Sequence, residues 1–315
     1  MSKYAIAIHG GAGTILKEEM TGEMEQLYIQ GLEEALNAGY AVLDKGGSAV
    51  DAVTQSCMLL EDNILFNAGR GSVFTRSGTH EMDACIMDGS SLRAGAVTCV
   101  RNIKNPILLA SEIMNHSDHV FLSGEGAFNF AVSREITTAP DDYFYTRHRY
   151  DQWLLAKDQE ETFLDHSDPA RQKLWKDKKF GTVGVVARDS SGNLAAATST
   201  GGMTNKNFNR IGDTPVIGSG NYANNHTCAI SCTGHGEIFL LAVAAYDVSC
   251  LMEYKNYSLQ QAMDIVVNDK LVKMKGEGGM VGVDAHGNIS MQFNSPGMYR
   301  AARNNEGYKE LAIYQ

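Results

Sequence analysis

The stretch Gly181-Thr182-Val183-Gly184 decides how this chain is interpreted. A threonine hydroxyl needs a base beside it at neutral pH, and a threonine at a chain terminus has one, because its α-amine has an unperturbed pKa of about 7.7–8.0. Gly181 suits a cut before Thr182, since a residue without Cβ adopts strained backbone and leaves its carbonyl open to attack. Taken alone, the tetrapeptide is better explained as the start of a buried strand. The surrounding sequence therefore has to decide.

Further motifs lie on both sides of this stretch. Near the start of the sequence stands IHGGAG at 8–13, and ATSTGGMT at 197–204 places Thr200 downstream of Thr182. The others, in chain order, are LFNAG at 65–69, MDACIMDG at 82–89, GEGA at 124–127, NRIGDT at 209–214, NYANN at 221–225 and ISCTGHGE at 230–237. In this combination and order they resemble the plant-type asparaginase and isoaspartyl-peptidase family of threonine N-terminal-nucleophile hydrolases. The resemblance covers essentially the whole chain.

The resemblance implies an α+β fold, a four-layer αββα sandwich in which two antiparallel sheets lie between helical layers. It implies one domain over residues 1–315, divided by autocleavage into an α subunit, 1–181, and a β subunit, 182–315. Residues 137–181 include a charged, irregular stretch. We expect there either a solvated helix and loop, or an exposed and flexible tail at the end of the first fragment.

Residue periodicity by itself predicts separate strands and helices. The predicted strands are 4–8, 94–100, 182–188, 194–200, 227–232, 280–284 and 289–293. The predicted helices are 23–43, 49–60 with Ser48 as N-cap, 106–114, 239–254 and 259–271. Turns at 190–193 and 286–288 are of the hairpin kind. Strands joined by hairpins, with helices grouped apart from them, favour an antiparallel α+β architecture over a parallel βαβ series.

The resemblance also implies the catalytic roles. The Thr182 hydroxyl attacks the substrate carbonyl, and its amine takes the proton and returns it to the leaving group. Thr200 is the second threonine, whose hydroxyl lies against the nucleophile, and Thr233 and Gly234 are the oxyanion donors through a hydroxyl and a backbone N–H. Without the resemblance, Thr200 is an ordinary strand residue, and Thr233 and Gly234 are the end of a strand.

The substrate implied by the family has an aspartyl head group with one carboxylate and one ammonium. Arg210 matches the residue that binds the carboxylate in a bidentate manner, and Asp213 matches the residue that pairs with the ammonium. The alternative for this pair is a surface salt bridge of little energetic value. Asn67 matches a substrate-binding residue near the nucleophile.

The loop at 60–70 resembles the one that wraps a structural sodium ion in this family. Carbonyl oxygens suit such a hard cation. The implied ligands are the backbone carbonyls of Leu60, Glu61, Asn63, Phe66, Ala68 and Arg70. Arg70 stands where the family pattern has an apolar residue. No cofactor is expected for catalysis.

The composition of the chain limits which classes of partner it can bind. A formal net charge of −10 over 315 residues disfavours nucleic acid and anionic membranes, so a small-molecule substrate is expected. The six cysteines have no metal-ligand spacing and are expected to be reduced thiols. No apolar segment is long enough for a membrane span or for the core of a signal sequence, so we expect the protein to be located in the cytoplasm. The resemblance implies a dimer of processed α–β units, a heterotetramer.

Three functions follow, in order of preference. The first is an autoprocessed amidohydrolase that hydrolyses L-asparagine to L-aspartate and ammonia and cleaves β-aspartyl dipeptides. The second is glycosylasparaginase, disfavoured because Gly181 stands where those enzymes have an acidic residue. The third is a non-catalytic ligand-binding α/β protein, whose chain stays whole. The preference between asparagine and dipeptides depends on how open the leaving-group side is, which sequence does not set.

The glycine-rich HGGAG at 9–13 follows a predicted strand, yet it matches neither GxxxxGK[ST] nor GxGxxG. It is therefore predicted to be a close-packing turn beside the active site. His9 is predicted to be a hydrogen-bonded core histidine in preference to a catalytic one.

Overall fold

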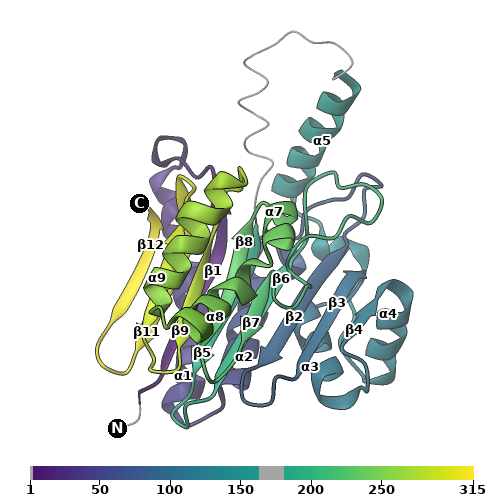
Figure 1. The fold of residues 1–315 in the computed structure, drawn as a ribbon. Coiled ribbons are helices and arrows are strands. Elements are labelled where there is room, and N and C mark those ends of the chain that lie inside the picture. The colour runs from purple at the N-terminus through teal and green to yellow at the C-terminus, as the bar shows by residue number, and fades with distance from the viewer. Residues whose placement is uncertain (1–2, 163–180) are drawn as a thin grey trace.

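The structure, a computed structural model, describes residues 3–162 and 181–315. Its centre is an eight-stranded sheet in the order β12-β11-β1-β5-β6-β2-β3-β4 (Figure 1). Its strands are β1 (Ala5–Gly13), β2 (Met82–Asp88), β3 (Ala94–Val100), β4 (Phe121–Ser123), β5 (Thr182–Arg188), β6 (Leu194–Thr200), β11 (Gly297–Asn304) and β12 (Lys309–Tyr314). Neighbouring strands are antiparallel except β3 and β4, which are parallel. A helix joins that pair, as a parallel connection requires.

A second sheet of four antiparallel strands packs on one face of the first. Its order is β10-β9-β8-β7, with β7 (Asn221–Ala223), β8 (Cys228–Gly234), β9 (Gly278–Asp284) and β10 (Ile289–Phe293). Strand β8 lies against β5 and β6, and β9 against β1. The buried side chains between the sheets are mostly alanine and valine. Small side chains let the two backbones approach closely, and this brings β5 and β8 together at the site described below.

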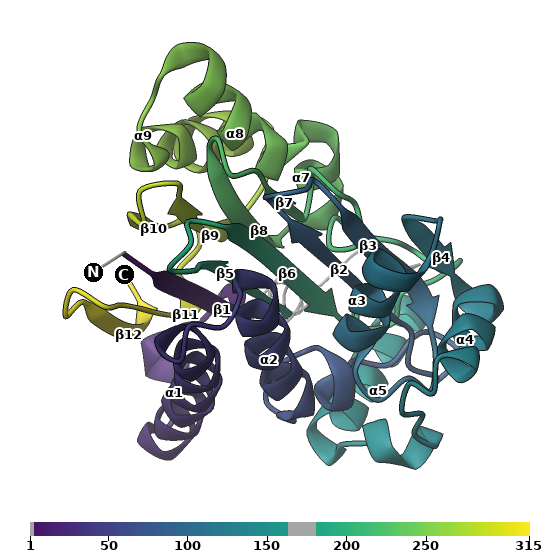
Figure 2. The same cartoon turned by 90° about the horizontal axis from the view of Figure 1, so that it is seen from below.

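Helices cover both outer faces, which completes four layers (Figure 2). The large sheet is covered by α1 (Gly22–Asp44), α2 (Ala49–Asp62) and α3 (Pro106–His116), and α4 (Gly124–Ser133) lies beside β3 and β4. The small sheet is covered by α7 (Gly236–Ala242), α8 (Ala244–Lys255) and α9 (Leu259–Asp264). Ser48 caps α2 by accepting from the Asp51 amide, as predicted. The predicted αββα sandwich is confirmed, with one parallel strand pair at its edge. No helix in the described ranges is long and apolar enough to cross a membrane.

Several predicted elements need correction. The single helix expected at 239–254 is two helices, because Val243 between α7 and α8 adopts the left-handed conformation with φ 49°. The helix expected at 259–271 continues from α9 as a π-helical segment, Ile265–Leu271. Strands β2, β4, β7, β11 and β12 and helix α4 were not among the predicted elements. Hydrophobic periodicity does not reveal a left-handed residue or a π turn within an otherwise helical pattern.

The charged stretch from residue 137 is partly helical up to residue 162, in agreement with the expected helix and loop. It contains a 3-10 helix, Asp141–Phe144, and the α-helix α5, Arg147–Thr162. Arg149 of α5 is buried and donates to the carbonyls of Gly71 and Leu65, at 2.9 and 3.0 Å. This part of the segment is therefore packed onto the loop at 60–70. The tail predicted at the end of the first fragment falls mainly on 163–180, outside the described residues.

Candidate active site

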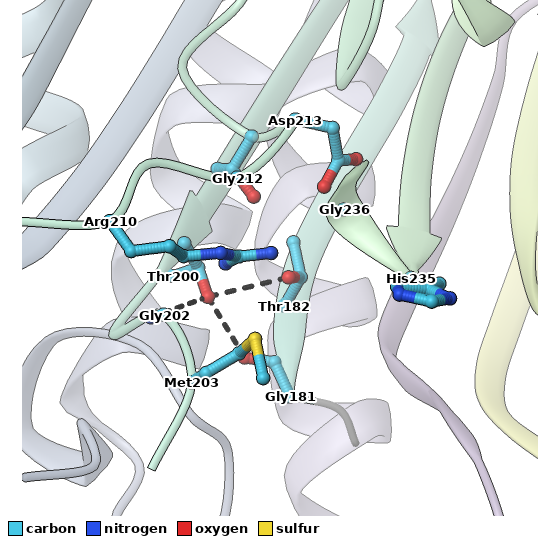
Figure 3. A pocket seen from close by; sticks show the side chains of 12 residues that line it. Gly181, Thr182, Thr200, Gly202, Met203, Arg210, Gly212, Asp213, His235 and Gly236 are labelled. Carbon is cyan, nitrogen blue, oxygen red and sulfur yellow. Dashed lines mark hydrogen bonds between the residues drawn. The ribbon is translucent and has the colours of Figure 1, made fainter. Parts of the chain in front are cut away.

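Thr182 and Thr200 lie side by side at one end of the large sheet. Thr182 begins β5, Thr200 ends β6, and the antiparallel register pairs them directly. The Thr182 hydroxyl donates to the Thr200 hydroxyl at 3.3 Å, and Thr200 donates in turn to the Gly181 carbonyl at 3.1 Å (Figure 3). The Gly202 amide donates to Thr200 Oγ1 at 3.0 Å. Thr200 thus links the hydroxyl of the predicted nucleophile to the carbonyl of the predicted cleavage site.

The backbone at Gly181 is closely surrounded. A Cβ on Gly181 would overlap the Cβ of Asn67, and a Cβ on Gly11 would lie 3.2 Å from the Gly181 Cα. Gly11 has φ +114°, a conformation that glycine adopts without strain. The glycine-rich segment 9–13 therefore lies beside the cleavage site, as predicted. The turn predicted there is wrong, because these residues continue strand β1, with a bulge between His9 and Gly11. Only glycine fits at position 181.

Asn67 borders the cleavage site instead of facing the pocket. Its side-chain nitrogen donates to the Gly202 carbonyl at 2.7 Å, and its side-chain oxygen accepts from the Val73 amide at 3.0 Å. Its backbone carbonyl accepts from Gly201 at 2.9 Å. Asn67 does not appear among the described residues lining the pocket. Its geometry favours holding the loops around Gly181 over direct contact with substrate.

A pocket opens beside the two threonines, with about 510 Å³ of empty space that includes open solvent. Its described lining residues come from the start of β5 and the residue before it, the end of β6, the segment after β6, and the junction of β8 with α7: Gly181, Thr182, Thr200, Gly202, Met203, Arg210, Gly212, Asp213, Thr214, Gly234, His235 and Gly236. Thr182, Thr200, Arg210, Asp213 and Gly234 are thus brought together from distant parts of the sequence. Figure 3 shows Arg210 and Asp213 reaching toward the space around Thr182.

The Arg210 side chain is held by a carboxylate that sequence analysis did not assign a role. Its Nε and Nη2 donate to the two carboxylate oxygens of Glu237, both at 2.8 Å. These bonds lower the pKa of Glu237. The backbone carbonyl of Arg210 also accepts from the buried Lys206 ammonium at 3.4 Å. The guanidinium therefore already makes the two-pronged contact that an α-carboxylate would require.

Asp213 is the second charged group of the pocket. It is 3% exposed, and its Oδ2 has no hydrogen-bond partner among the described residues. Burial raises the pKa of the Asp213 carboxyl to about 7, partly offset by the Arg210 charge. A buried carboxylate oxygen without a donor is costly. It is a fitting partner for a substrate ammonium.

Thr233 and Gly234 form the end of β8. The Thr233 hydroxyl is fully buried and accepts from the Ala12 amide at 3.3 Å. Gly234 lines the pocket, with φ +152° and no space for a Cβ between Gly278 and Phe239. The structure places Gly234 at the pocket, whereas Thr233, directly before it in the strand, is not among the described residues that line the pocket.

The loop at 60–70 brings backbone carbonyls together. A Cβ on Gly69 would lie 2.5 Å from the Glu61 carbonyl oxygen. A Cβ on Gly71 would overlap the Phe66 carbonyl oxygen and would lie 3.1 Å from the Asn63 carbonyl oxygen. The Arg70 guanidinium lies over the Tyr143 ring, 5.2 Å from its centroid. In the parts of the chain that the structure describes, no cluster of histidine, cysteine and acidic side chains could hold a metal ion.

Comparison with known proteins adds independent information. The family model described as asparaginase matches residues 2–313. The isoaspartyl peptidase of Salmonella typhimurium is 52% identical over 96% of this chain and 95% of its own, and that of Escherichia coli is 50% identical over 96% and 93%. The probable isoaspartyl peptidase/L-asparaginase 2 of Arabidopsis thaliana is 38% identical over the whole of both chains. This chain therefore belongs to the plant-type asparaginase and isoaspartyl-peptidase family of threonine N-terminal-nucleophile hydrolases.

Proposed function

We propose that this protein is an autoprocessed amidohydrolase that hydrolyses L-asparagine to L-aspartate and ammonia and cleaves β-aspartyl dipeptides. The observation that carries the proposal is the line of hydrogen bonds from Thr182 through Thr200 to the Gly181 carbonyl, in the lining of a pocket that also includes Arg210 and Asp213. The names of the relatives support the same activity. They also disfavour the glycosylasparaginase and non-catalytic alternatives.

Processing begins at the Gly181–Thr182 bond. The Thr182 hydroxyl oxygen attacks the Gly181 carbonyl carbon, and the hydroxyl proton passes to the Thr182 nitrogen as the C–N bond breaks. Thr200, which donates to the Gly181 oxygen, stabilises the charge that develops there. Water then hydrolyses the ester, which leaves a carboxylate on Gly181 and a free amine on Thr182.

Turnover repeats this chemistry on the substrate. The Thr182 amine takes the hydroxyl proton while the oxygen attacks the β-carbonyl, and the amine then gives the proton to the departing ammonia or amino acid. Water hydrolyses the resulting β-aspartyl ester. In this scheme Thr233 and Gly234 stabilise the oxyanion, Arg210 exchanges Glu237 for the substrate carboxylate, and Asp213 pairs with the substrate ammonium.

The direct test is an assay of the purified protein with L-asparagine and with a β-aspartyl dipeptide. We expect the wild type to release aspartate from both substrates. A Thr182→Ala variant is expected to release it from neither. Wild-type protein that is fully cleaved at Thr182 yet inactive on both substrates would contradict the proposed activity.

We also propose that the loop at 60–70 binds a structural sodium ion. The implied ligands are the backbone carbonyls of Leu60, Glu61, Asn63, Phe66, Ala68 and Arg70. The proximity of the Glu61, Asn63 and Phe66 oxygens to Gly69 and Gly71 supports this, as does the Arg70 side chain packing on Tyr143. The ion would supply no chemistry to turnover. It would hold the loop that places Asn67 against Gly181.

The assembly, partners and location are proposals of the same kind. We propose a dimer of processed α–β units, with residues 1–181 and 182–315 as the two subunits of one domain. The net charge of −10 supports a small-molecule substrate over nucleic acid, and cytoplasmic location is proposed with it.

A further inference from the structure

A buried chain of hydrogen bonds runs behind Thr182. Nδ1 of His9 on β1 lies 3.1 Å from the Thr182 carbonyl oxygen, and Nε2 lies 2.9 Å from Oγ of Ser231 on β8. Oγ of Ser231 lies 2.7 Å from Oγ1 of Thr198 on β6. All three side chains are fully buried. This series of hydrogen bonds therefore connects the backbone of the proposed nucleophile to both sheets.

The partners determine where the protons lie. A carbonyl oxygen only accepts, so Nδ1 of His9 carries the proton and Nε2 accepts from the Ser231 hydroxyl. Ser231 Oγ then accepts from Thr198. Burial lowers the pKa of His9 to about 3, so the ring is neutral at physiological pH. Its bond goes to the Thr182 carbonyl and not to the hydroxyl, which excludes His9 as the base for that hydroxyl in this arrangement.

The surrounding backbone has room for this ring only because Gly184 has no side chain. The register of β1 with β5 pairs His9 with Gly184, and a Cβ on Gly184 would overlap both His9 Nε2 and Ser231 Oγ. That pair is the last of the register, since β1 bulges after His9. Two residues before Gly184 in β5, the His9 ring contacts the Thr182 carbonyl.

We propose that His9 is a positioning residue that holds the Thr182 carbonyl and so orients the hydroxyl and the amine of the mature N-terminal residue. Once the chain is cut, Thr182 is no longer tethered through its nitrogen. Nucleophile and base then belong to one residue, and a rotation of its backbone displaces both. A displacement of about 1 Å in such geometry costs on the order of 10²-fold in rate. The inference rests on the proposed function.

Two substitutions at His9 separate this role from simple packing. In His9→Asn, the amide nitrogen occupies the place of Nδ1 and can donate to the Thr182 carbonyl, but the side chain does not reach Ser231. In His9→Gln, the amide lies one bond further out, near Ser231, and away from that carbonyl. We expect His9→Gln to lower kcat about 10²-fold. His9→Asn is expected to keep a kcat about tenfold higher than the glutamine variant.

The measurement is steady-state kinetics on L-asparagine, with kcat normalised to the cleaved fraction found by intact mass, and thermal unfolding of each variant. KM is expected to stay within about twofold in both variants, because Arg210 and Asp213 bind the head group. The acid limb of the kcat profile is expected to keep its apparent pKa, since His9 is not the base. A shift of that limb would contradict the inference.

Equal kcat values in cleaved, folded His9→Asn and His9→Gln protein would overturn the inference and leave His9 as a packing residue. If the glutamine variant does not fold, Ser231→Ala decides. The Ser231→Ala substitution keeps Nδ1 of His9 as the donor to the Thr182 carbonyl but removes the hydrogen bond that fixes the His9 ring. A kcat several-fold lower at constant KM supports the inference. An unchanged kcat overturns it. Failure of the proposed function is distinguishable, because the wild type would then be inactive.

Discussion

At the scale of single residues, the hydroxyl of Thr200 has two partners that matter for processing. It accepts from the Thr182 hydroxyl and donates to the Gly181 carbonyl, so the attacking group and the bond it attacks are aligned by one side chain. In substrate binding, the Glu237 carboxylate occupies the position proposed for the substrate carboxylate, because it accepts hydrogen bonds from both Nε and Nη2 of Arg210. The site is thus already arranged for the groups that the proposed substrate carries.

The role of Arg210 is tested by replacing it. Arg210→Ala is expected to raise KM for L-asparagine about 10- to 100-fold, the worth of a lost charged hydrogen-bond pair. Chain cleavage should continue, because the Gly181–Thr182 bond offers no α-carboxylate to the guanidinium. Arg210→Lys should restore only part of the affinity, since an ammonium lacks the two-pronged geometry. Wild-type KM in the alanine variant would exclude a binding role.

Asp213 predicts a pH dependence of binding. With its pKa raised to about 7 by burial, the carboxyl becomes protonated and loses its charge as the pH falls through that value. A neutral carboxyl pairs weakly with the substrate ammonium, so KM should rise between about pH 8 and pH 6. In Asp213→Asn, KM should be high and flat over the same range. A wild-type KM that stays constant from about pH 6 to pH 8 contradicts the assignment of Asp213 as the partner of the substrate ammonium.

At the scale of elements, the sequence predicted a helix or strand correctly wherever one hydrophobic periodicity continued without interruption. The strands at 182–188, 194–200 and 289–293 were predicted with the bounds they have. The alternation is less clear in Gly297–Asn304 and Lys309–Tyr314, where charged and apolar residues mix, and these strands were missed. Pairing of Thr182 with Thr200 depends on the register of two strands, which a single sequence does not contain.

The break between α7 and α8 predicts a gain in stability. Val243 has φ 49° and ψ 49°, which costs a β-branched residue about 1–2 kcal/mol. Val243→Gly should remove that strain, and after the entropy that glycine loses on folding we expect a gain of about 0.5–1 kcal/mol. Leu241→Gly, within α7 and 75% exposed, is the control and should lose about 1 kcal/mol. Chemical denaturation measures both; a Val243→Gly protein less stable than wild type contradicts the account.

The loop at 60–70 predicts a dependence of stability on sodium. An ion that binds only the folded state raises the free energy of unfolding, so replacing sodium chloride by choline chloride at equal ionic strength should lower Tm by a few degrees. In Gly71→Ala the new Cβ would enter the space between the Phe66 and Asn63 carbonyls, and the difference between the two salts should disappear. Equal Tm values for the wild type in both salts would exclude the ion.

At the scale of the whole molecule, the site lies where the two sheets meet and both proposed subunits contribute to it. Gly11 and Asn67 come from before the cut, and Thr182, Thr200 and Gly234 from after it. Strand β5 lies between β1 and β6 in the middle of the large sheet. Cutting before Thr182 therefore leaves the strand of the second fragment buried against the first, and the fragments should separate only on denaturation.

That such a cut exists is the central claim, and sequencing of the fragments from denatured, purified protein tests it most directly. We predict two fragments, residues 1–181 and 182–315, with the smaller beginning Thr-Val-Gly-Val. The Thr182→Ala protein should remain one chain. A fragment that began at any other residue, or an uncut wild type that still hydrolysed asparagine, would show that Thr182 is not an N-terminal nucleophile.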